Sequence, residues 1–168
     1  MKRWATPVLF LLSGLALLHG PMLRDGAGRV HGNMVDGRLV ALLLEHGHAW
    51  LMGRAPSLFS PTWLFYPYPN ALALTDTMVG ATVLYSPWRW LGASPLHAFQ
   101  LWLVCCATLG FAAVHRLARR LGISSLGACV AAFVVTFAMP RVSAAHHPQL
   151  AFFLPIPLVM LAGLAAAS

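Results

Sequence analysis

Apolar residues in this chain gather into long runs separated by short polar segments, and the length of each run predicts its structure. A run of about 20 apolar residues is long enough to cross a bilayer as a helix. Four runs approach this length and predict membrane spans over residues 4–19, 95–117, 123–139 and 150–167. We expect the first to be an uncleaved anchor, because no small-residue cleavage site follows it.

Residues 36–52 have a helical period without being apolar throughout. Apolar side chains and one histidine recur at the spacing of a single helix face: Leu39, Leu42, Leu43, His46 and Trp50. We expect Gly47 to interrupt this helix and Gly53 to end it. An amphipathic helix of this kind is typical of one that lies on the membrane surface.

Residues 75–91 predict a second surface helix, with Thr75 as its N-cap. Pro87 and Arg89 near its end argue against a full span. Between the two helices, residues 55–70 contain four prolines and predict extended, turn-rich chain. The expected fold is therefore an all-α polytopic transmembrane helix bundle, with two juxtamembrane interfacial helices in the first outer loop.

Composition agrees with this pattern and narrows the partners. Hydrophobic residues make up 59% of the chain and charged residues 9%, and the mean hydropathy is +0.72. A soluble domain has about 25% charged residues, so the solvent for most of this chain must be a lipid bilayer. The net charge is +7, but the basic residues are scattered and form no continuous face for nucleic acid, so we expect no nucleic-acid partner.

Basic residues also predict the orientation of the chain. Lys2 and Arg3 precede the first span, and the densest basic cluster lies at residues 115–120. Both belong on the cytoplasmic side by the positive-inside rule, which requires an even number of crossings between them. This favours an interfacial position for residues 75–91, a cytoplasmic N-terminus, and an outer position for Asp36 and residues 140–149.

Two acids at helix starts are the candidate catalytic residues, Asp36 and Asp76. A short acid in this position caps free N–H groups and the helix dipole. The alternative is a surface carboxylate that deprotonates an acceptor hydroxyl or holds a metal. Both roles stay open for both residues.

The candidate substrate-binding residues share a predicted outer position and side chains suited to phosphate or sugar: Arg38, Glu45, Tyr66, Arg141, His146, His147 and Gln149. Ordinary anchoring at the lipid head groups would use the same residue types. Glu45, His46 and His48 lack the spacing of a zinc-protease motif, and packing of His46 on the apolar face is favoured over a metal site.

The motif Asn33-Met-Val-Asp36-Gly-Arg38, followed by Leu44-Glu-His46 and Trp50, resembles the early acidic motif and first juxtamembrane helix of the GT-C superfamily of membrane glycosyltransferases. This group includes protein O-mannosyltransferases and aminoarabinose transferases. Phe65 to Asn70, with Thr75-Asp76 and Gly80, is similar to the segment leading into their second such helix. His146 to Gln149 falls where relatives place polar residues of the second outer loop. Gly37 departs from the pattern, since many members have Glu after the Asp.

The resemblance implies that residues 1–168 are the N-terminal part of a GT-C-like transmembrane domain, and we expect a longer protein. It implies sugar transfer from a polyprenyl-phosphate donor, by inverting displacement, on the outer face of the bacterial inner membrane. Asp36 would be the general base, with Arg and His side chains around the lipid phosphate. The requirement for a divalent metal cofactor stays open.

A non-catalytic membrane protein, either a transporter fragment or an assembly subunit, is the alternative. Transport favours ionisable or helix-breaking positions at mid-membrane. The predicted spans lack charged residues at their centres, and Pro155 and Pro157 in the last span are the feature that favours this alternative.

Overall fold

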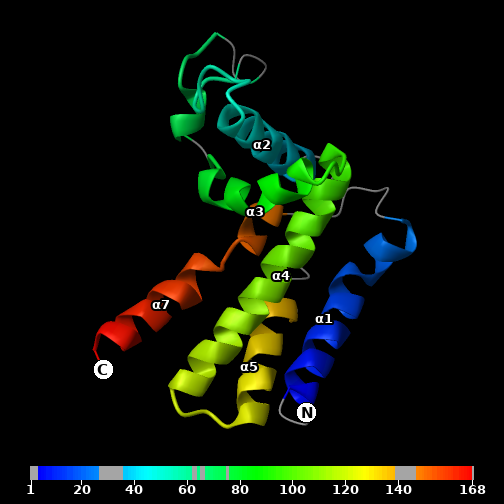
Figure 1. Ribbon diagram of the computed structural model, residues 1–168, viewed down its shortest axis with the longest axis vertical. Helices are drawn as coiled ribbons and strands as arrows, with labels where there is room; N and C mark the ends of the chain where they lie inside the picture. The colour runs from blue at the N-terminus through cyan, green and yellow to red at the C-terminus, as the bar shows by residue number, and fades with distance from the viewer. Residues whose placement is uncertain are drawn as a thin grey trace.

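A computed structural model describes residues 4–26, 36–61, 64, 67–74, 76–138 and 147–167 of the chain, and these residues contain helices and no strand. This confirms the all-α prediction. Figure 1 shows the elements in chain order: α1 (Ala5–Arg24), α2 (Asp36–Leu51), η1 (Ala71–Leu74), α3 (Val79–Trp90), α4 (Pro95–Arg120), α5 (Ser125–Phe137), η3 (Pro148–Ala151) and α7 (Pro155–Ala166).

Three stretches are long and apolar enough to cross a membrane: Ala5–Arg24, Pro95–Arg120 and Pro148–Ala166. The first continues through Pro21, past the predicted end at residue 19, and its 20 residues reach about 30 Å. The remaining predicted span, residues 123–139, forms α5, whose 13 residues are fewer than those of the other three stretches. The chain is therefore a membrane protein by length and composition of its helices, and its orientation in the membrane stays a prediction.

The central helix of the structure is α4. In the apolar stretch of α4, 56% of the residues are buried inside the protein. The corresponding fractions are 22% for α1 and 6% for Pro148–Ala166. Ser94 caps the helix by accepting a hydrogen bond from the backbone N–H of His97, and Pro95 occupies the first turn, where its missing N–H costs nothing. The remaining helices pack around α4 and leave their outer apolar side chains for lipid.

Two apolar clusters lie along α4, one toward each of its ends. At its N-terminal end, Phe99 and Trp102 pack against Leu44 of α2 and Tyr85 of α3. At its C-terminal end, Phe111 packs with α1 and α5. Figure 1 shows α2 and α3 lying across the first of these ends, with the start of α1 and the α4–α5 turn at the other.

The close packing of α2 on α3 corrects one prediction. Gly47 does not interrupt α2, which runs unbroken from Asp36 to Leu51. Gly47 instead lets Thr82 of α3 approach closely, since a Cβ there would lie 2.5 Å from Thr82 Oγ1. Gly53 has φ +67° and follows the end of the helix, as predicted.

The predicted apolar face of α2 divides between buried and exposed positions. Leu43 and His46 are buried, whereas Leu42 and Trp50 are 49% and 39% exposed. The buried stripe also includes Val40, Leu44 and His48, because these face α3 and α4. Helix α2 thus has one stripe of side chains that packs against the protein and a neighbouring apolar stripe that is exposed. The hydrophobic period of the sequence does not distinguish these two stripes.

The start of α3 differs from the predicted helix of residues 75–91. Its N-cap is Met78, in a left-handed conformation with φ +54°, and the helix begins at Val79. Asp76 therefore lies outside the capping position, and Thr75 lies outside the described residues. The described part of residues 55–70 contains no helix, which agrees with its four prolines.

Candidate functional site

Asp36 and His147 meet although 111 positions separate them in the chain. Asp36 is the first residue of α2, and His147 immediately precedes η3. The Nδ1 of His147 lies 2.6 Å from Oδ2 of Asp36, a short hydrogen bond that becomes an ion pair when the imidazole is protonated. The structure thus joins the predicted early acidic motif to the second predicted outer loop.

The pair lies at the surface, where a ligand can reach it. The side chains of His147 and Asp36 are 55% and 28% exposed. Two residues along, Gln149 is half-buried, and its Oε1 is a buried atom without a hydrogen-bond partner among the described residues. The other candidates of these loops, Tyr66, Arg141 and His146, lie outside the described residues.

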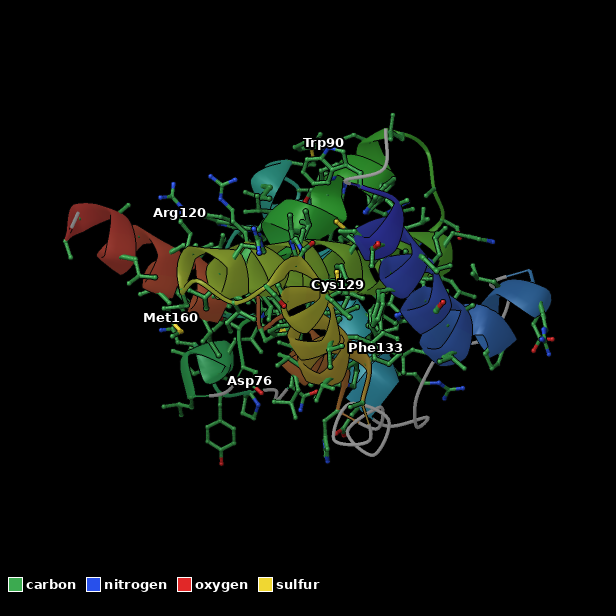
Figure 2. All side chains as sticks on the ribbon, turned by 90° about the horizontal axis from the view of Figure 1, so that it is seen from below. Asp76, Trp90, Arg120, Cys129, Phe133 and Met160 are labelled. Atoms are coloured by element: carbon green, nitrogen blue, oxygen red, sulfur yellow. The ribbon has the colours of Figure 1, made fainter. Side chains whose placement is uncertain are left out.

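Arg38 and Asp76 are not joined to this pair by any contact within the described part of the chain. Arg38 is exposed, and two residues along a helix place it about 200° around the axis from Asp36. Asp76 is exposed ahead of α3, and no hydrogen bond or ion pair links it to another described residue. Figure 2 shows Asp76 at the edge of the molecule.

Glu45 lies about 13 Å from Asp36 along the axis of α2 and forms a separate cluster. Arg89 of α3 donates to both of its carboxylate oxygens, at 2.9 Å through Nε and 3.0 Å through Nη2. The hydroxyl of Tyr85 donates to Oε2 at 2.6 Å. Arg89 also donates to the backbone carbonyl of Ala93, which ties the end of α3 to the turn before α4.

The electrostatics of this cluster favour the charged pair. Burial alone would raise the pKa of Glu45, but the hydrogen bonds from Arg89 and Tyr85 and the charge of Arg89 together lower it. The hydrogen bond from Arg89 to Glu45 raises the pKa of the arginine. Burial and the bond to Glu45 raise the pKa of Tyr85, which therefore stays a donor. Glu45, Tyr85 and Arg89 thus form a clamp that joins α2 to α3.

Two histidines of α2 have structural partners. The ring Nε2 of His46 lies 3.0 and 3.1 Å from the carbonyl oxygens of Ser57 and Leu58, so it must donate, and it holds the proline-rich segment against the helix. Arg54 lies 3.2 Å from Nε2 of His48, and an arginine only donates. Burial is the main cause that lowers the pKa of His48. The charge of Glu45 opposes this shift, and the charges of Arg54 and Arg89 add to it.

A cavity of about 290 Å³ lies between α2 and the proline-rich segment, lined by Glu45, His46 and Arg54 among others. Within the described ranges, no group of three or more His, Cys, Asp or Glu side chains could hold a metal ion. The polar groups that line this cavity are already engaged in bonds between α2, α3 and the loop.

Tyr85 and Arg89 were missed by the sequence reasoning, which used Arg89 only as an argument against a span. They lie four residues apart in the second predicted helix, so they share one face of it. A tyrosine and an arginine at that spacing, opposite an acid on a neighbouring amphipathic helix, are the signal that could have identified the clamp.

Comparisons of the chain with known protein families, with curated proteins and with solved structures find no match.

Proposed function

We propose that this chain is part of a membrane glycosyltransferase that moves a sugar from a polyprenyl-phosphate donor to an acceptor at the outer membrane surface. The observation that carries the proposal is the 2.6 Å contact between Asp36 and His147. It unites two motifs that resemble GT-C enzymes, each from a different predicted outer loop. The bilayer would concentrate the lipid donor at this surface.

Asp36 is the general base of the proposed reaction. A carboxylate accepts several hydrogen bonds at once, so the contact with His147 leaves capacity for an acceptor hydroxyl. As the hydroxyl attacks the anomeric carbon, Asp36 takes its proton and the lipid phosphate leaves. In its protonated form, His147 donates through Nδ1 to Asp36 and through its other ring nitrogen to the phosphate, and it stabilises the charge that develops there.

The exposure of the pair favours a functional role over a stabilising one. An ion pair between side chains exposed to this degree contributes about 0–1 kcal/mol to stability. Loss of a general base, in contrast, lowers a rate by about 10²–10⁴-fold. A variant that keeps the fold and loses the rate separates the two roles.

The test uses membranes containing the full-length protein, with radiolabelled polyprenyl-phosphate mannose and polyprenyl-phosphate aminoarabinose offered as donors. We expect Asp36→Asn to lower sugar transfer by at least about 100-fold without changing the denaturation midpoint. Asp25→Asn, which removes an exposed acid that is not a candidate site residue, is the matched control and should transfer near the wild-type rate. Sugar transfer at the wild-type rate by Asp36→Asn would refute the proposal.

One observation bears on the transporter alternative. Pro155 occupies the first turn of α7, and Pro157 lies in the same turn. Proline is tolerated there because the first N–H groups of a helix have no partner within it. These prolines begin α7, and the stretch Pro148–Ala166 is interrupted just before them, between η3 and α7. The transporter alternative therefore stays open.

A further inference from the structure

A groove of about 980 Å³ opens between the start of α1 and the last turns of α4. It lies at the end of the molecule opposite α2 and α3, where Figure 1 shows the start of α1 and the α4–α5 turn. Val8 and Leu11 of α1 and Phe111 and Ala112 of α4 form its apolar walls. Its size is within the range of ligand sites, and the apolar walls suit hydrocarbon.

Two arginines stand at the rim of this groove. Arg116 and Arg119 lie three residues apart on α4, share one face of it and are both exposed. Arg119 donates through Nη1 to the carbonyl of Ile123 at 2.7 Å, which fixes its guanidinium at the helix end. The side chain of Arg116 forms no hydrogen bond or ion pair with any other residue that the structure describes.

No carboxylate of the chain neutralises these charges. The sequence contains four acids, and all four are described. Asp25 follows α1, about 20–30 Å along the helix from the α1 residues that line the groove. Asp36, Glu45 and Asp76 belong to α2 and to the segment before α3, at the far end of the molecule. Two arginines beside an apolar groove, with no Asp or Glu near them, favour binding of an anion that is not part of the chain.

We propose that this groove binds one anionic phospholipid, with its phosphate on Arg116 and Arg119 and an acyl chain along the apolar walls. Guanidinium groups bind phosphate oxygens through charge-assisted hydrogen bonds in a fixed geometry. A lipid fits better than free phosphate because the walls continue along α1, whose Val8 is 48% exposed in the apolar part of the helix. Basic pockets between membrane helices recognise such head groups.

The experiment measures lipid retained by the purified full-length protein by native mass spectrometry during titration with phosphatidylglycerol or phosphatidylcholine of identical acyl chains. We expect phosphatidylglycerol to bind more tightly. Arg116→Gln should weaken its binding about tenfold, the loss typical of one hydrogen bond between charged groups. Arg120→Gln is the matched control, because Arg120 is exposed on the same helix end but does not line the groove. Figure 2 shows it toward the outer edge, away from α1.

Each of the following four outcomes would overturn the proposal. Equal weakening by Arg116→Gln and Arg120→Gln would mean general attraction to the surface charge. Ala112→Trp fills the groove without changing charge, so unaltered binding in that variant would place the lipid elsewhere. Displacement of phosphatidylglycerol by millimolar inorganic phosphate would identify a free-phosphate site. A lipid-free dimer that Ala112→Trp dissociates would identify a second copy of the chain as the occupant.

Discussion

A methyl group added at Gly47 tests the packing that positions the candidate site. The Cβ of Gly47→Ala would lie 2.5 Å from Oγ1 and 3.1 Å from Cγ2 of Thr82. Thr82 is 2% exposed, and its hydroxyl donates to the carbonyl of Met78 at 3.0 Å. A short, branched and buried side chain has little freedom to move, so α2 and α3 must separate to admit the methyl group.

The magnitude follows from two opposing effects. Overpacking of this kind costs about 1–3 kcal/mol. Alanine in a helix interior is favoured over glycine by about 1 kcal/mol. We therefore expect Gly47→Ala to lower the free energy of unfolding by up to about 2 kcal/mol. Gly163→Ala in α7, where no atom lies within 4 Å of the new Cβ, has the second effect alone and should not destabilise the protein.

The assay is denaturation of the purified protein in detergent micelles, followed by tryptophan fluorescence. Thr82→Ala removes both clashing atoms, so Gly47→Ala should cost less in that background, with a coupling energy of about 0.5–3 kcal/mol. If Gly47→Ala is as stable as the wild type and shows no coupling to Thr82→Ala, the described contact between α2 and α3 is wrong.

Three further predictions use the same denaturation assay. Glu45→Gln should lower stability by about 1–3 kcal/mol, because the pair with Arg89 is neither fully buried nor fully exposed, and an equally stable variant would contradict the clamp. The pKa of Glu45 is lowered from 4.5, so the pair stabilises the protein above that pH and the contribution fades in acid. The wild type's advantage over Glu45→Gln should therefore shrink between neutral pH and about pH 3, and a constant difference would contradict this assignment. Gly110→Ala would place a Cβ 2.5 Å from Cζ of Phe153 and, by the same two opposing effects, should lower stability by up to about 2 kcal/mol. Phe153→Leu should relieve this loss, and a loss that Phe153→Leu leaves unchanged would contradict the contact.

Local sequence signals predicted most helices and failed at particular ends. Ser94 and Pro95 mark the start of α4 by capping rules that act within one turn. The first span was predicted to end at residue 19, yet α1 continues through Pro21 to Arg24. An apolar solvent offers no partners to free backbone groups, so a helix interrupted by one lost hydrogen bond is preferred over unpaired chain. The local sequence alone therefore does not decide that helix end.

The candidate site was predictable in its parts and not in its assembly. Asp36 and His147 were both selected from their residue types and predicted loops. Their contact joins positions 111 apart, so it depends on how α2 and η3 pack against the bundle, which no local pattern contains. The clamp on Glu45 was missed for a related reason. Gly47 was interpreted as a helix breaker, whereas its function is the close approach that brings α3 alongside α2.

The two acids of α2 have opposite surroundings, and this contrast explains how one helix can serve both structure and chemistry. Glu45 has Arg89 on both oxygens and Tyr85 on one, so its charge is used within the protein. Asp36, about 13 Å away along the axis, meets a half-exposed imidazole at the surface. Because the clamp fixes the middle of α2, the first turn is presented to η3 in a defined position. A rigid helix held at its buried centre can therefore orient an exposed carboxylate at its end, as the proposed reaction requires.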